Sequence, residues 1–155
     1  MPLLRAALSW NFVLATAICA SLLAQLIKVL LNLFIFHRFI AERMWGAGGM
    51  PSSHSATVCA MVVATGRYCG VSSPIFAIAA VLSIIVMYDA MGVRYETGEQ
   101  AKVLNRMFTE WMDQGFEQFQ LPHGKKLKEM VGHTPIEVVT GAALGIVLGF
   151  AMPMV

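Results

Sequence analysis

Four long apolar segments constrain the fold of this 155-residue chain more than any other feature. They run over about residues 6–36, 53–68, 74–92 and 135–152. A helix that crosses a bilayer needs about 20 mainly apolar residues, and 57% of this chain is hydrophobic while only 13% is charged. We therefore expect one integral membrane domain over residues 1–155, an all-α polytopic bundle of about four transmembrane helices.

The third and fourth segments are separated by a polar stretch with its own helical pattern. Its apolar residues recur at helical spacing: Ala101, Leu104, Met107, Phe108, Trp111 and Met112. This pattern predicts an amphipathic helix that lies in the membrane interface or along a partner.

Small residues repeat on the last apolar segment. Gly141, Gly145 and Gly149 recur every four residues, which predicts a face for close helix packing. A bundle of four spans also makes a homodimer a reasonable expectation.

The stretch Gly48–Ser55 concentrates polar and conformationally special residues between the first two apolar segments. Its glycines allow the backbone to approach a ligand closely, and a proline followed by serines favours a helix start. The first amides of that helix favour an anion, and His54 can exchange protons near neutral pH. The pattern predicts an anion site, for phosphate, at a membrane surface, although Ser52 alone also suits an ordinary helix cap.

Four alternating spans would bring the unusual polar residues to one side of the membrane: Lys28, Ser52, Ser53, His54, Asp89, Arg94, His133 and Glu137. Lys28 shares a helix face with Gln25 and Asn32, which indicates either a functional polar stripe or a lysine that snorkels to the surface. The same side carries most basic residues, among them Arg38, Arg43, Lys102, Arg106, Lys125, Lys126 and Lys128, whereas the other side has only Arg5 and Arg67. The positive-inside rule then makes the polar face cytoplasmic.

Several sequence blocks resemble a known family. Pro51-Ser52-Ser53-His54 resembles the proline-serine-glycine-histidine signature of the type 2 phosphatidic acid phosphatase and vanadium haloperoxidase superfamily, and His133 with Glu137 four residues later resembles another of its motifs. The closest resemblance is to the divergent branch of this superfamily, in the blocks Gly48–Ala56, Tyr88–Arg94, Gln100–Asn105 and Leu127–Pro135.

The resemblance implies roles for individual residues. His133 would be the nucleophile, Glu137 its orienting acid, and His54 the proton donor to the leaving group. The phosphate ligands would come from Lys28, Ser52, Ser53, Arg94 and Lys128, with support from Asp89, Asn105 and Gln25. The expected function is a membrane phosphatase that hydrolyses a lipid phosphate or diphosphate and needs no metal or other cofactor.

Other functions and roles stay open at this stage. Glu137 replaces the family's aspartate, and Lys126-Leu127 stands where the family has serine-arginine, so a non-catalytic anion- or lipid-binding protein or a small transporter subunit is an alternative. Thr134 and Glu137 also form a capping-box pattern, and Asp89 and Arg94 could form only an ion pair. A net charge of +2 without a nucleic-acid-binding motif argues against nucleic acid. The three cysteines form no metal or disulfide pattern, and we expect them to be buried.

Overall fold

The computed structural model describes residues 11–36, 49–114, 126–129 and 131–154, and every regular element in these ranges is a helix. The helices are α2 (Phe12–Phe36), α4 (Ser53–Cys69), α5 (Pro74–Met91), α6 (Val93–Asp113) and α7 (Pro135–Ala151). The all-α prediction is therefore confirmed for the described residues. The four apolar segments coincide with α2, α4, α5 and α7, although the expected start of the first one, residues 6–10, lies outside the description.

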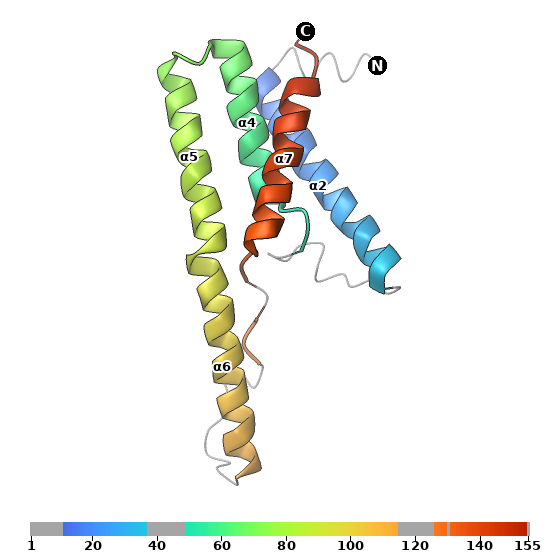
Figure 1. Cartoon of the computed structure of the whole chain (residues 1–155), viewed down its shortest axis with the longest axis vertical. Helices are drawn as coiled ribbons and strands as arrows, with labels where there is room; N and C mark the ends of the chain where they lie inside the picture. Colours follow the sequence, from blue (N-terminus) through green and yellow to red (C-terminus); the bar gives the residue numbers. More distant parts are fainter. Residues whose placement is uncertain (1–10, 37–48, 115–125, 130, 155) are drawn as a thin grey trace.

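The helix α4 is the centre of the bundle. It packs against α2, α5 and α7 (Figure 1). The helices α2 and α5 run in one direction, and α4 and α7 run in the other (Figure 1). The last turns of α2 and α5 and the first turns of α4 and α7 therefore point toward the same end of the bundle, as alternating spans require.

Small side chains fill the contact between α2, α4 and α7. Ala20 and Ala24 of α2 pack against Ala56 and Ala60 of α4, and all four are completely buried. The partly buried side chains of Leu144 and Leu148 close this cluster from α7. Residues this small let the helix backbones approach closely, so the stability of the bundle depends on short-range packing.

The glycines of α7 make the closest of these approaches. A Cβ atom on Gly141 would meet the carbonyl oxygen of Ser52, and one on Gly145 would meet that of Ala56. A Cβ atom on Gly149 would lie 2.6 Å from the Cβ of Val63. The predicted small-residue packing face is confirmed, and its partner is α4.

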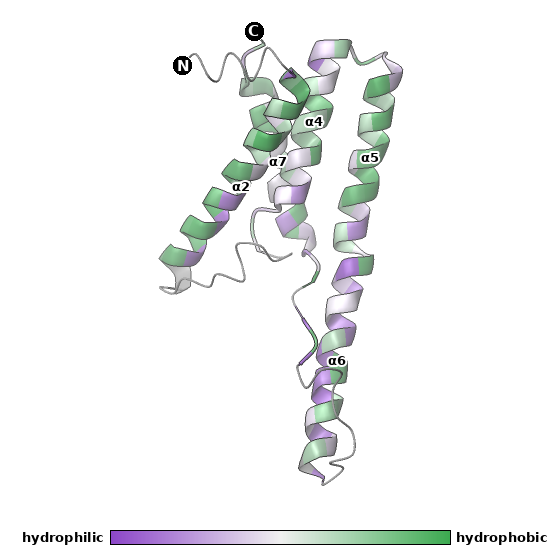
Figure 2. Ribbon diagram, turned by 180° about the vertical axis from the view of Figure 1, so that it is seen from behind, coloured by the Kyte–Doolittle hydropathy of each residue, from purple (hydrophilic) through white to green (hydrophobic). Residues whose placement is uncertain are grey.

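Two described helical stretches are long and apolar enough to cross a membrane, Phe12–Phe34 and Pro74–Met112. The apolar helix α7 is shorter than these stretches. Most residues of α5 are hydrophobic, as the colours of Figure 2 show, and large side chains such as those of Ile78, Ile84 and Ile85 are exposed. Such a surface suits contact with lipid, whereas the crossing of α4 and α7 stays a prediction.

The helix α6 continues α5 almost without a change of direction (Figure 1). Helical hydrogen bonds pass on both sides of Gly92, from its N–H to the Tyr88 carbonyl and from the Glu96 N–H to its own carbonyl. The amphipathic helix is thus confirmed, and its polar character begins where α5 ends (Figure 2). Of its apolar residues only Ala101 is fully buried, whereas Leu104, Met107 and Met112 are exposed.

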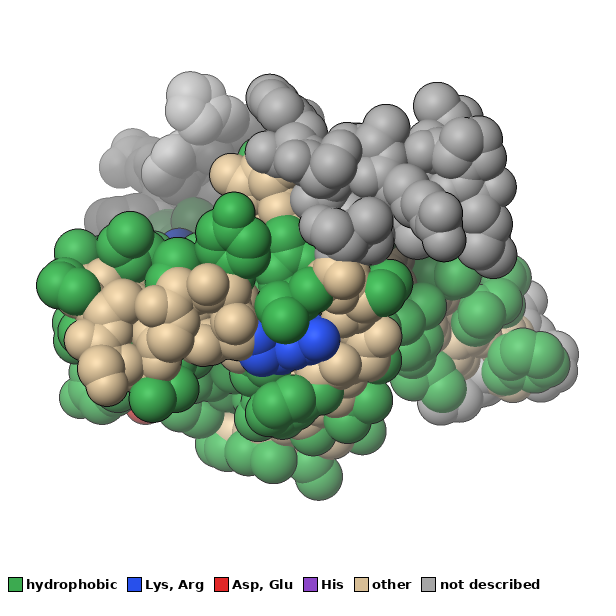
Figure 3. Space-filling view, turned by 90° about the horizontal axis from the view of Figure 1, so that it is seen from above, with side chains coloured by type: hydrophobic (Ala, Val, Ile, Leu, Met, Phe, Trp, Pro, Cys, Tyr) green, Lys and Arg blue, Asp and Glu red, His purple; other side chains and the backbone are tan. Residues whose placement is uncertain are grey.

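Arg67 joins α4 to α7 at the end of the bundle opposite to their first turns, where both helices end. It lies in the last turn of α4, and its Nη1 donates hydrogen bonds of 2.6 and 2.7 Å to the carbonyl oxygens of Gly149 and Met152. These carbonyls end α7 and have no partner within that helix. Figure 3 looks onto this end and shows basic side-chain atoms surrounded by hydrophobic and uncharged ones.

One expectation for the cysteines is wrong. Cys59 is buried and Cys19 is half-buried, but Cys69 is exposed. The reason is its position as the last residue of α4, before the turn at Gly70, where none of the described helices covers it.

The α4–α7 contact can be tested with one methyl group. Changing Gly145 to alanine should lower the free energy of unfolding by about 1–3 kcal/mol, because the added methyl meets a backbone oxygen that cannot rotate away. Ala143→Val on the exposed face of α7 is the matched control and should have little effect. Thermal unfolding in detergent measures both variants, and an unchanged midpoint for Gly145→Ala would contradict this packing.

Candidate functional site

The first turns of α4 and α7 are joined through the backbone and side chain of one residue, Glu137. The Ser52 N–H donates to the Glu137 carbonyl oxygen at 2.9 Å. The Gly49 N–H donates to the Glu137 Oε1 at 3.2 Å. These bonds bring the described part of the Gly48–Ser55 stretch, residues 49–55, beside the segment that carries His133, although the two lie about eighty residues apart in the sequence.

The second carboxylate oxygen of Glu137 caps its own helix. Its Oε2 accepts a hydrogen bond of 3.0 Å from the Thr134 N–H. The capping role predicted from the Thr134-to-Glu137 spacing is thus confirmed. Both oxygens are used by backbone N–H groups, so the alternative role of orienting His133 stays a prediction without a contact that supports it.

Ser52 and Ser55 fix the start of α4. The Ser52 Oγ accepts hydrogen bonds from the Ser55 N–H at 3.3 Å and the Ser55 hydroxyl at 3.1 Å, and both residues are completely buried. Ser52 is therefore the helix cap that its position suggested. Ser53, the first residue of α4, is also buried, with 7% of its surface exposed. The positive end of the helix dipole thus lies beside Glu137 and the neighbouring histidine segment.

Lys28 reaches the same place from α2. It follows Ala20 and Ala24 at four-residue spacing on the buried face of that helix and is only 2% exposed. A Cβ atom on Gly49 would lie 3.4 Å from the Lys28 Cδ, and Gly49 has a φ of +90°, which a side chain would strain. The snorkelling alternative is wrong, because this side chain lies against the backbone of the glycine stretch. Gln25 and Asn32, which share its helix face, are half-buried.

His133 is held between the end of α5 and the start of α7. Its backbone N–H donates a hydrogen bond of 3.1 Å to the Ala90 carbonyl oxygen, and the residue is 1% exposed. Its ring meets the ring of His54 edge to face, with centroids 5.8 Å apart and an interplanar angle of 79°. His54, on the first turn of α4, is exposed. A buried imidazole and a water-accessible imidazole are thus in direct contact.

Both ring nitrogens of His133 are buried and make no hydrogen bond with any described residue. An unpaired polar group costs free energy in a buried position. Buried polar groups in native proteins nearly always have partners, so an unpaired one suggests a ligand or a reactive role.

The surroundings keep His133 neutral. Burial, together with the nearby charges of Lys28, His54 and Arg94, lowers the pKa of His133 to about 4. At neutral pH the ring therefore has one nitrogen with a lone pair and one N–H. A neutral imidazole with an available lone pair can act as a nucleophile or a base.

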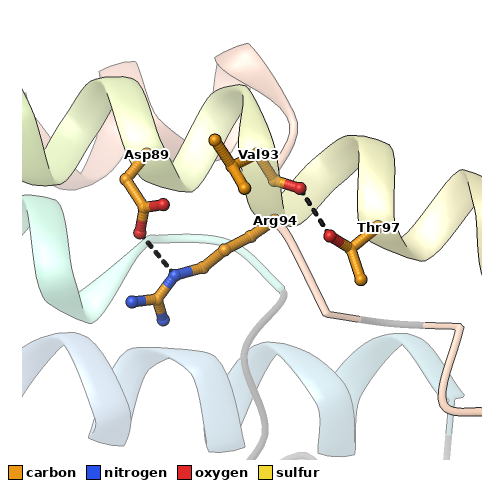
Figure 4. Close-up of polar contacts among 4 residues, drawn as sticks. All are labelled: Asp89, Val93, Arg94 and Thr97. Atoms are coloured by element: carbon orange, nitrogen blue, oxygen red, sulfur yellow. Dashed lines mark hydrogen bonds and ion pairs between the residues drawn. The ribbon is translucent and has the colours of Figure 1, made fainter.

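Arg94 enters the site from the first turn of α6 as half of an ion pair. Its Nε lies 2.6 Å from the Asp89 Oδ2, and the two side chains point toward one another from α6 and α5 (Figure 4). The ion pair predicted for these residues is confirmed. It uses the Nε, so the two Nη groups of Arg94 lie outside it. Arg94 acts electrostatically on both His54 and His133, as does Lys28.

Two predicted site residues lie along α6, farther from the histidines. Asn105 lies twelve residues after the start of α6 and is 5% exposed, with its amide bonded to Leu127 and Glu129. Lys128 is exposed on the segment that these bonds hold. No contact of either residue with His54 or His133 is seen, so their direct role at the phosphate stays a prediction.

Three contributors to the site lie within the sequence blocks quoted above, but none was assigned the contact that it makes. Gly49 lies beside Lys28, the Ala90 carbonyl holds the backbone of His133, and Glu129 bonds Asn105. Each acts through a contact across the fold, and Ala90 acts through its backbone alone. Among the described residues, no three His, Cys, Asp or Glu side chains gather as a metal-binding group.

Comparison with known proteins gives one family and one curated relative. The model of a family described as the Divergent PAP2 family matches residues 9–148, a range that contains all the site residues above. The Uncharacterized membrane protein YuiD of Bacillus subtilis (strain 168) is 38% identical over 144 residues, which cover 89% of this chain and 91% of that protein. No solved structure matches this chain.

The titration of His133 tests the site directly. An ordinary histidine binds its proton near pH 6.5, and we expect the His133 ring to stay neutral until about pH 4. Between these values the unfolded chain binds more protons than the folded protein, so His133 should make the fold less stable as the pH falls from about 6.5 to about 4. Nitrogen NMR of labelled histidine, with His133→Gln to assign the signal, measures the titration, and a midpoint near 6.5 would contradict this environment.

Proposed function

This chain belongs to the divergent PAP2 family, and on that premise we propose that it is a membrane phosphatase that hydrolyses a lipid phosphate or diphosphate through His133. The observation that carries the proposal is the pair of unpaired ring nitrogens on a buried, neutral His133 in contact with an exposed His54. A ring that only filled space would not need two buried polar atoms.

The reaction proceeds in two displacement steps. A ring nitrogen of His133 attacks the phosphorus, so a nitrogen–phosphorus bond forms while the bond between phosphorus and the lipid oxygen breaks. Protonated His54 donates its proton to that leaving oxygen. Water then attacks the phosphorylated His133, His54 takes up a proton from this water, and release of phosphate restores both rings.

Positive charge stabilises the oxygens of the transferring phosphoryl group. Lys28, the Nη groups of Arg94 and the first amides of α4 supply this charge. Asp89 holds Arg94 in place between turnovers through their ion pair, and the charge of Glu137 acts on Lys28. Exposure of His54 lets it exchange its proton with water after each cycle.

The proposed substrate arrives from the bilayer. We place α4 and α7 across the membrane together with α2 and α5, so that the end with both histidines faces the cytoplasm. The excess of lysine and arginine on that side supports this orientation, although Arg38, Arg43 and Lys125 lie outside the described residues. A lipid phosphate would then enter with its charged group at the histidines and its chains in the bilayer.

One observation favours a second candidate, a membrane protein that binds a lipid phosphate without hydrolysis. The carboxylate of Glu137 is bonded to the backbone at Gly49 and Thr134, and among the described residues no hydrogen bond joins an acid to the His133 ring. A histidine without that acid is a poorer nucleophile but still accepts a hydrogen bond or donates one. This candidate predicts affinity for lipid phosphate without turnover.

Phosphate release separates the two candidates. Purified protein in detergent should release phosphate from at least one of phosphatidic acid, phosphatidylglycerophosphate and polyprenyl diphosphate in the presence of a metal chelator. His133→Ala should abolish this activity, since no nucleophile remains. His54→Ala should reduce it by about 100- to 10,000-fold, the usual contribution of a general acid.

Thr97→Val is the matched control. Thr97 lies close to Arg94 in the chain but is exposed, and its hydroxyl bonds only the Val93 carbonyl of its own helix (Figure 4). This variant should keep the wild-type rate. Release that survives His133→Ala would exclude the mechanism, and tight lipid-phosphate binding with no release from any lipid would favour the binding protein.

A further inference from the structure

The segment before His133 lies along α6 and is fastened there by Asn105. The Leu127 N–H donates to the Asn105 Oδ1 at 2.8 Å, and the Asn105 Nδ2 donates to the Leu127 carbonyl at 2.9 Å. The side-chain amide thus pairs with both backbone groups of one residue, as a neighbouring strand would. The same Nδ2 donates to the Glu129 Oε1 at 2.8 Å.

Two glycines bring the rest of the segment against the helix. A Cβ atom on Gly98 would lie 2.5 Å from the Glu129 carbonyl oxygen, and one on Gly132 would meet the backbone of Tyr95. Successive residues of the segment therefore contact Asn105, then Gly98, then Tyr95, and so lie progressively nearer to the start of α6 as the chain approaches His133. The next residue is His133, whose backbone N–H donates to the Ala90 carbonyl oxygen at the end of α5.

Among the described residues, the segment before His133 is what covers the buried face of α6. Among the described helices, α6 packs only against α5, end to end. Its buried positions are Gly98, Ala101 and Asn105, the face on which Glu129 and Leu127 lie. The block Gln100–Asn105, in which no contact with His54 or His133 is seen, therefore holds this segment through Asn105.

We propose that Asn105 is a positioning residue for His133, because it fastens to α6 the segment that delivers His133 to the site. The proposal rests on the proposed function only for its effect on catalysis. Its effect on the placement of His133 follows from the contacts alone. Glu129 assists by fixing the orientation of the Asn105 amide.

Chemical modification measures the placement without any assay of activity. Diethyl pyrocarbonate reacts with neutral imidazole, and mass spectrometry of the full-length protein in detergent gives a rate for each histidine. His133 is buried and should react slowly, whereas His54 is exposed and serves as the internal reference. Asn105→Ala should raise the modification rate of His133 by about tenfold or more, because it removes the hydrogen bonds that hold the segment against α6.

Two variants of Glu129 and one control refine the test. Glu129→Gln keeps an oxygen that accepts from Asn105 and should leave the His133 rate unchanged, whereas Glu129→Ala should raise it by a smaller factor than Asn105→Ala. Arg106→Ala, at the exposed neighbouring position, loses only an ion pair with Glu110 and should behave as wild type. An unchanged His133 rate in Asn105→Ala would overturn the proposal. An equal rise at His54 and His133 would also overturn it, since that result means general unfolding.

Phosphate release then shows whether this placement serves catalysis. In Asn105→Ala we expect kcat to fall by about 100-fold with little change in KM, because a displaced nucleophile slows the chemical step more than binding. Exposure of His133 in a protein whose wild type releases no phosphate would support the positioning role and contradict the proposed function. Exposure of His133 with an unchanged kcat would overturn the catalytic part of this proposal.

Discussion

The close contact between α4 and α7 is the constraint on which the site depends. Gly141 and Gly145 let the backbone of α7 touch α4, and Glu137 then bonds the backbone at Gly49 and Ser52. Because His54 lies in the first turn of α4 and His133 lies two residues before α7, this contact brings the two rings together, and the Ala90 carbonyl of α5 also holds His133. A larger residue at either glycine would push α7 away from α4 and move the two histidines apart. The packing of these helices therefore also fixes the geometry of the site.

The buried polar groups of the site lower the free energy of unfolding, and this loss of stability is the strongest physical signature of the site. Lys28 and His133 are both almost fully buried, and neither ring nitrogen of His133 has a partner among the described residues. Each such group reduces stability unless a partner offsets its desolvation. The cluster between α2, α4 and α7 consists of small apolar side chains, chiefly alanines, which carry no such cost. The polar end of the bundle retains groups that suit an anionic ligand.

Sequence patterns predicted those parts of the structure that depend on local spacing. The helices, the caps at Ser52 and Glu137 and the glycine face of α7 all repeat over a few residues, which is the range at which helical periodicity acts. The contacts of Lys28 with Gly49 and of Asn105 with Leu127 join residues 21 and 22 positions apart across chain reversals, and no local pattern encodes them. Glu137 shows a different limit, since one spacing suits both a helix cap and an acid that orients His133; its hydrogen bonds confirm the cap, and the orienting role stays a prediction.

The central claim is that the buried ring of His133 accepts a phosphoryl group, and vanadate tests it most directly. Vanadate resembles the transferring phosphoryl group, so it should bind to a ring nitrogen of His133 and shift the nitrogen NMR signal of that ring, and added inorganic phosphate should reverse the shift. His54→Ala should retain this response if His133 is the acceptor. An unchanged His133 signal at saturating vanadate would contradict the account.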